Sequence, residues 1–94
     1  MRVRAKRDIN HAELRAAFRT AGCTVHDTGA VGDGFPDLVV GLLGRSHIVE
    51  VKSPGGQLTV DQVTFKDDWR GDYFVVESLD DVIALVKMWR RWFT

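Results

Sequence analysis

The sequence predicts a single α/β (α+β) domain, in which a central mixed sheet of about four strands is flanked by helices. Two short apolar runs rich in β-branched residues, 38–43 and 48–51, are joined by a glycine-containing turn and read as a strand hairpin. Three other segments carry apolar residues at helical spacing. Because the strands are apolar on both faces, we expect a sandwich with helices on both sides of the sheet. A chain of 94 residues has room for one small core, so this domain is expected to span residues 1–94.

The first segment is expected to be a basic region followed by a helix. Residues 1–8 alternate basic and apolar side chains, which fits a basic N-terminal arm, a short edge strand, or both in different states. Asn10 is expected to cap a helix over residues 11–21, with Glu13 completing a capping-box pattern. The expected apolar stripe of this helix consists of Leu14, Ala17, Phe18 and Ala21.

The hairpin is expected to bring three charged side chains together. A strand over residues 24–28 and a glycine-rich connection precede it. A two-residue loop at 43–44 would set Asp37 opposite Glu50, and opposed residues share a face of the sheet. Lys52, two residues beyond Glu50, lies on that same face. Two carboxylates and an ammonium are thus predicted to meet at one end of strands that are otherwise nearly all apolar.

A helix, a strand and a second helix complete the expected fold. Thr59 and Gln62 form another capping-box pattern that opens a helix reaching about residue 70. A fourth strand is expected over residues 73–77, and Ser78 then caps a last helix. The predicted order is therefore helix, three strands, helix, strand, helix.

Composition and charge exclude some classes of protein. The 13 basic and 13 acidic side chains balance, so net charge gives no support to nucleic-acid binding. The distribution is uneven, however, because basic residues gather in residues 1–19 and acidic ones in residues 61–81. The basic segment could meet phosphates or be an ordinary solvated surface. The single cysteine, Cys23, excludes an intrachain disulfide and favours a core position and a cytoplasmic setting. No run is long and apolar enough to predict a membrane span.

The expected cluster has a defined chemistry. Singly, Asp37 reads as a turn residue after Pro36, and Glu50 and Lys52 read as solvent-facing positions of an alternating strand. Together, two carboxylates on adjacent strands form a hard-oxygen site suited to Mg²⁺ or Mn²⁺. Lys52 beside it could orient a water, help to deprotonate it, or stabilise charge on a phosphate in the transition state. Since an unperturbed lysine is a poor base at neutral pH, the positional or electrostatic role is favoured.

These motifs resemble a known nuclease superfamily. Pro36-Asp37, followed by Glu50-Val51-Lys52 on the next strand, is similar to the PD-(D/E)XK signature. The chain from NHAE (residues 10–13) through the hairpin to LTVDQ (58–62) and WRGDYFVVES (69–78) resembles the stand-alone VRR-Nuc domain proteins of phages and bacteria. The resemblance implies a restriction-endonuclease-like sandwich with an αβββαβ core plus a C-terminal helix.

The resemblance also implies a divalent-metal-dependent DNA endonuclease. Asp37, Glu50 and the Val51 carbonyl would bind Mg²⁺ or Mn²⁺, and Lys52 would be the catalytic lysine. Glu13 matches an additional acidic residue that contacts the metal directly or through water, and Gln62 matches a polar residue on the helix after the lysine strand. Helix capping is the alternative role for both.

The resemblance also implies a substrate and an assembly. Stand-alone relatives are associated with homodimers that act on branched DNA, especially four-way junctions. Because these relatives come from phages and bacteria, the resemblance implies a bacterial or phage-encoded protein in the bacterial cytoplasm. A catalytically silent nucleic-acid-binding module, or a nuclease for flaps, single-stranded DNA or RNA, stays an alternative. The three histidines, His11, His26 and His47, show no metal-ligand spacing and are expected to have ordinary structural or surface roles. The basic side chains expected to contact DNA are Arg2, Arg4, Lys6, Arg7, Arg15 and Arg19.

Overall fold

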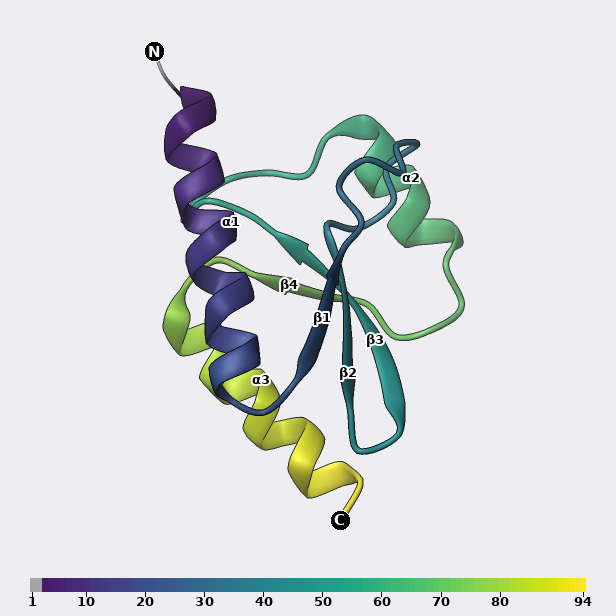
Figure 1. The fold of residues 1–94 in the computed structure, drawn as a ribbon. Coiled ribbons are helices and arrows are strands. Elements are labelled where there is room, and N and C mark those ends of the chain that lie inside the picture. The colour runs from purple at the N-terminus through teal and green to yellow at the C-terminus, as the bar shows by residue number, and fades with distance from the viewer. Residues whose placement is uncertain (1–2) are drawn as a thin grey trace.

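The fold is a mixed four-stranded sheet with three helices (Figure 1). The computed structural model describes the backbone of residues 3–94 and the side chains of residues 10–94. Its elements are α1 (Val3–Thr20), β1 (Thr24–Asp27), β2 (Leu38–Leu42), β3 (Arg45–Val51), α2 (Val60–Asp68), β4 (Phe74–Val76) and α3 (Leu79–Trp92). The predicted α+β class and the predicted order of elements are both confirmed.

The sheet is built around the predicted hairpin. Its strand order is β1-β2-β3-β4, with β1, β2 and β3 antiparallel and β4 parallel to β3. Leu43 (φ 54°) and Gly44 (φ 76°) both adopt left-handed backbone geometry, as a two-residue hairpin loop of the twist-compatible kind requires. The resulting register pairs Leu42 with Arg45 and Val39 with Ile48, as the sequence predicts.

The two faces of the sheet are covered unequally. Figure 1 shows α1 and α3 packed together on one face, while α2 lies on the other. Alternate residues of β3 identify the faces: the His47 ring stacks on Trp89 of α3 with ring centroids 4.0 Å apart, whereas Glu50 contacts Gln62 of α2. The main core lies on the α1/α3 face, and α2 has no buried residue. The α2 face therefore leaves room for polar side chains at the strand ends.

The start of α1 differs from the prediction. The helix begins at Val3, so Asn10 lies inside it and does not cap it, and the expected edge strand is wrong for residues 3–8. The run of good helix formers in residues 4–7 allows this extension. The Asn10 side chain instead donates a hydrogen bond to the Lys52 carbonyl at 3.2 Å, so the polar group that resembles a cap has a tertiary partner. Glu13 therefore has no capping role.

The other two helix starts follow the sequence. Thr59 caps α2 with both halves of the capping box formed, and Ser78 caps α3 by accepting from the Asp81 amide. Cys23 is a buried free thiol in the core, as expected, and burial raises its pKa. Within residues 3–94, no helix is both long and apolar enough to span a bilayer.

Candidate active site

Asp37 is fixed where the chain enters β2. Its backbone carbonyl accepts a hydrogen bond from the Thr28 amide at 2.7 Å, which ties it to the end of β1. One carboxylate oxygen, Oδ2, accepts from the Val51 amide at 2.9 Å. Only 8% of the residue is exposed. Asp37 is therefore a buried carboxylate held against the end of β3.

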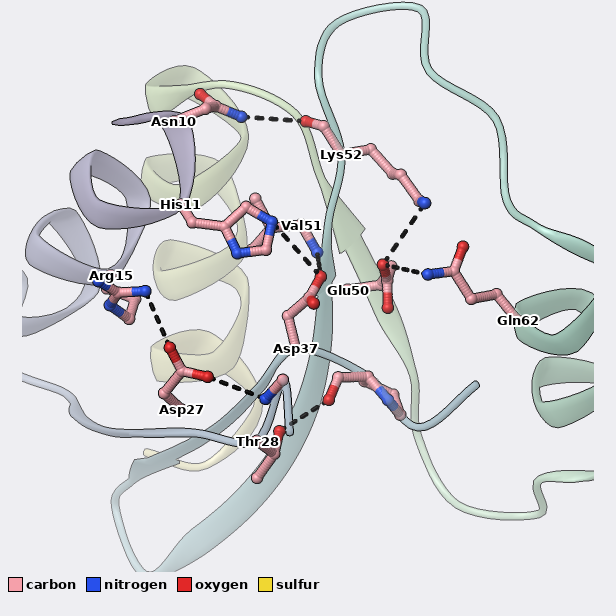
Figure 2. Close-up of polar contacts among 12 residues, drawn as sticks. Asn10, His11, Arg15, Asp27, Thr28, Asp37, Glu50, Val51, Lys52 and Gln62 are labelled. Carbon is pink, nitrogen blue, oxygen red and sulfur yellow. Dashed lines mark hydrogen bonds and ion pairs between the residues drawn. The ribbon is translucent and has the colours of Figure 1, made fainter. Parts of the chain in front are cut away.

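Glu50 is the second carboxylate of the site and is fully buried. Gln62 donates from Nε2 to Glu50 Oε2 at 3.0 Å, and the Lys52 ammonium lies 3.7 Å from the same oxygen. Figure 2 shows the Lys52 and Gln62 side chains converging on Glu50 from the β3 end and from α2. The structure thus brings together four residues that the sequence singles out, Asp37, Glu50, Lys52 and Gln62.

Gln62 makes two side-chain contacts at the start of α2. Its Oε1 accepts from the Thr59 amide at 2.9 Å, which is the capping interaction. Its Nε2 donates to Glu50, which is the site interaction. One amide side chain therefore links the N-terminus of α2 to the carboxylate of β3.

Gly34 explains how α2 approaches the site. Its φ is +77°, and an added Cβ would collide with the backbone carbonyl of Asp61, in the first turn of α2. The glycine-rich connection therefore passes close to the helix that carries Gln62.

The donor set fits a hard divalent cation. Asp37 and Glu50 supply carboxylate oxygens from adjacent strands. The Val51 amide points at Asp37, and in an extended strand the carbonyl of the same residue lies toward the same neighbouring strand. Among the described residues, no group of three or more His, Cys, Asp or Glu side chains is arranged to hold a metal. Few protein ligands are what Mg²⁺ uses, because it retains waters and binds substrate phosphates.

Glu13 is not brought to this cluster. It is exposed and lines a groove of about 470 Å³ between α1 and the start of α3, with Leu79 and Ile83 on the opposite side. Residues two apart on a helix point in nearly opposite directions. The α1 side chain that turns toward Asp37 is therefore His11 and not Glu13.

His11 is a neighbour of the site that the sequence did not reveal. Its Nε2 lies 3.8 Å from Asp37 Oδ2 and is buried, with no hydrogen-bond partner among the described residues. Figure 2 shows the His11 ring and the Val51 amide pointing at the same carboxylate. The spacing of the histidines could not predict this contact, because the neighbour of His11 is not another histidine but Asp37, a carboxylate 26 positions later.

Tyr73 is a second neighbour that the sequence did not reveal. Glu50 is paired with Val75 in the parallel register, so Tyr73, two residues before Val75, lies on the Glu50 side of the sheet. Burial raises the pKa of its hydroxyl to about 12, with smaller contributions from the charges of Glu50 and Asp37. Its hydroxyl is buried without a hydrogen-bond partner among the described residues. Tyr73 is therefore a neutral hydroxyl beside the carboxylates at physiological pH.

The basic residues expected to contact DNA fall into two groups. Arg15 forms an ion pair with Asp27 at 2.9 Å, and Arg19 donates a hydrogen bond to the Val25 carbonyl at 3.3 Å. Both side chains therefore link α1 to β1. Arg2 lies outside the described residues, as do the side chains of Arg4, Lys6 and Arg7. Direct contact with DNA stays a prediction for all six.

The mixed four-stranded sheet and three helices are consistent with an α+β domain of the PD-(D/E)XK-like fold. The chain is similar to a solved structure described as a VRR_NUC domain, with a TM-score of 0.72 and 27% sequence identity over 87% of this chain and 95% of that chain. This likeness extends over nearly the whole of both chains and supports the α+β fold of a VRR_NUC domain. No protein-family model matches the chain, and no curated protein matches it.

Proposed function

We propose that this protein is a Mg²⁺- or Mn²⁺-dependent DNA endonuclease that hydrolyses phosphodiester bonds at the Asp37/Glu50 site. The observation that supports this most is the full burial of Glu50 beside a second buried carboxylate, Asp37. Burying charged groups is unfavourable unless a cation or close pairing compensates. A site that costs stability in this way is typical of function.

Each residue of the site has a separate part in the proposal. Asp37, Glu50 and the Val51 carbonyl would hold the cation, which would act as a Lewis acid toward the phosphate and lower the pKa of a bound water. Lys52 holds a positive charge 3.7 Å from Glu50 and would stabilise negative charge on the phosphate oxygens. Gln62 orients Glu50 through its 3.0 Å hydrogen bond.

We further propose that the substrate is branched DNA, such as a four-way junction, and that the protein acts as a homodimer. Several large apolar side chains are exposed on the described surface and could be covered by a second copy: Leu79, Ile83, Val75 and Trp92 are each at least 40% exposed. Two copies would place two sites on one branched substrate. Sedimentation at micromolar concentration, with and without junction DNA, tests this proposal, and a monomer in both conditions would refute the dimer.

A substrate panel tests the activity. Four-way junction, flap, duplex and single-stranded DNA and a single-stranded RNA are incubated with Mg²⁺, Mn²⁺ or EDTA. We expect metal-dependent cleavage that is strongest on the junction and is lost in Asp37→Asn and Lys52→Ala. Asp67→Asn, which removes an exposed carboxylate of α2, is the matched control and should cleave like the wild type.

Each alternative gives a different result in this panel. Cleavage that survives Asp37→Asn would refute the site assignment. Cleavage of RNA or flaps alone would refute the junction preference and leave a nuclease. Binding without cleavage under any metal would identify a silent nucleic-acid-binding module.

A further inference from the structure

One side of α1 presents a row of donors to the sheet. His11, Arg15 and Arg19 are each four residues apart and therefore share a side of the helix. Arg15 meets the Asp27 carboxylate at 2.9 Å, and Arg19 meets the Val25 carbonyl at 3.3 Å. Each arginine of the row thus donates to an acceptor on or next to β1.

His11 continues this row to the candidate site. The acceptor opposite it is the Asp37 carboxylate, 3.8 Å away. Its immediate neighbour Asn10 is already fastened to the carbonyl of Lys52. The first described side chains of α1 therefore close one side of the site, against residues of both hairpin strands.

The His11 contact is incomplete in a way that the two arginine contacts are not. A separation of 3.8 Å is too long for a hydrogen bond, yet Nε2 is buried and has no other hydrogen-bond partner among the described residues. A buried polar atom without a partner is uncommon and needs a physical explanation. Hydrogen bonds around active sites are often long in the free protein and shorten when the site is loaded.

We propose that His11 is a positioning residue, whose Nε2–H donates to Asp37 Oδ2 and fixes that carboxylate for binding of the divalent cation. The Val51 amide already holds the same oxygen. A second donor from α1 would fix the direction in which the carboxylate presents its other oxygen. This inference rests on the proposed metal-dependent function and adds a residue to it.

The proposal predicts an effect on metal affinity. Groups that hydrogen-bond to metal ligands typically change metal affinity by about 10- to 100-fold when they are removed. We therefore expect weaker Mn²⁺ binding when the His11 donor is lost, even before any DNA is added. A role confined to packing α1 on the sheet would change folding stability and not Mn²⁺ affinity.

Two amide variants form a matched pair for the test. The amide nitrogen of His11→Gln can reach the place of Nε2, whereas that of His11→Asn is one methylene short. Mn²⁺ affinity is measured on the full chain by electron paramagnetic resonance and calorimetry, with thermal unfolding in parallel. We expect His11→Asn to weaken Mn²⁺ binding by about 10- to 100-fold, His11→Gln to recover most of it, and the exposed-histidine control His26→Ala to bind like the wild type.

The position of the ring proton gives an independent readout on the unmodified protein. Nitrogen-15 chemical shifts of the His11 ring should show a proton on Nε2. A ring protonated only on Nδ1 would overturn the proposal, as would equal Mn²⁺ affinity in the wild type and His11→Asn. In that second case the proposed function would still stand, whereas wild-type protein that binds no Mn²⁺ and cleaves no substrate would overturn both.

Discussion

The two contacts of the Gln62 side chain, with the Thr59 amide and with Glu50, can be tested separately by substitution. Gln62→Glu keeps the oxygen that accepts from the Thr59 amide, and glutamate at this position is itself a capping-box residue. The same change removes the amide group that donates to Glu50 and places a carboxylate beside a carboxylate. Gln62→Ala removes both interactions.

The magnitudes follow from the two contacts. A hydrogen bond to a charged group contributes about 1.5–3 kcal/mol to stability, and a capping side chain contributes about 1 kcal/mol. We therefore expect Gln62→Glu to lower the free energy of unfolding by at least about 1.5–3 kcal/mol, because charge repulsion adds to the lost bond. Thr59→Ala, which affects the cap alone, should cost about 1 kcal/mol.

Urea unfolding at neutral pH measures these differences, with the dependence on urea compared among variants to check that each unfolds in the same manner. The result that would refute the reasoning is Gln62→Glu being as stable as the wild type. That result would mean that the Nε2 contact with Glu50 contributes nothing. A loss in Gln62→Ala no larger than that in Thr59→Ala would mean that capping is the main role of Gln62.

Three further predictions concern other parts of the fold. The chain has one tyrosine, so absorbance of the phenolate should report Tyr73 alone, with a midpoint near pH 12; a midpoint near 10 would contradict its burial. Because the pKa of Tyr73 in the folded state is raised from 10.0, the stability that the neutral side chain contributes is fully present below pH 10 and is lost as the pH rises through about 12. Tyr73→Phe should remove this loss of stability at high pH. Gly34→Ala should cost more stability than Gly44→Ala in urea unfolding, because both positions have positive φ but only the added Cβ at Gly34 meets a backbone carbonyl; equal losses would contradict the close approach of α2. Arg15→Ala should lower the free energy of unfolding by less than about 1 kcal/mol, since its ion pair is partly exposed, and a loss of several kcal/mol would contradict that assignment.

The hairpin could be predicted because local chemistry determines it. Leu43 and Gly44 form a two-residue loop, and once the loop length is known, the alternation of side chains sets which residues are opposed. The approach of Asp37 to the strand that carries Glu50 and Lys52 follows from that register. The Thr59 and Ser78 helix caps could be predicted for the same reason, since each depends on neighbours within four residues.

The contribution of α1 could not be predicted in this way. Asn10 followed by Glu13 has the spacing of a capping box, but the same asparagine donates to a carbonyl 42 positions away once the helix packs on the sheet. Whether His11 or Glu13 faces Asp37 depends on the rotation of α1 about its axis. That rotation is set by burial of Leu14 and Phe18 in the core and not by any local motif.

The place of Tyr73 beside the carboxylates could not be predicted from the sequence for a related reason. Its position beside the carboxylates depends on β4 pairing in parallel with β3, a contact between segments separated by α2. Long-range pairing of this kind leaves little trace in the residues around Tyr73. His47 was expected to have an ordinary structural or surface role, and its stacking on Trp89 is a structural one. Its partner could not be predicted, because β3 and α3 are distant in sequence.

The central claim is that Asp37 and Glu50 hold a divalent cation at the end of the hairpin. A crystal of the protein soaked in Mn²⁺ tests it most directly, because anomalous scattering locates the ion without reference to activity. We predict one or more Mn²⁺ ions in contact with both carboxylates, and no ion there in a crystal of Asp37→Asn. A wild-type crystal without Mn²⁺ at these two carboxylates, or with the ion bound only elsewhere, would contradict the claim.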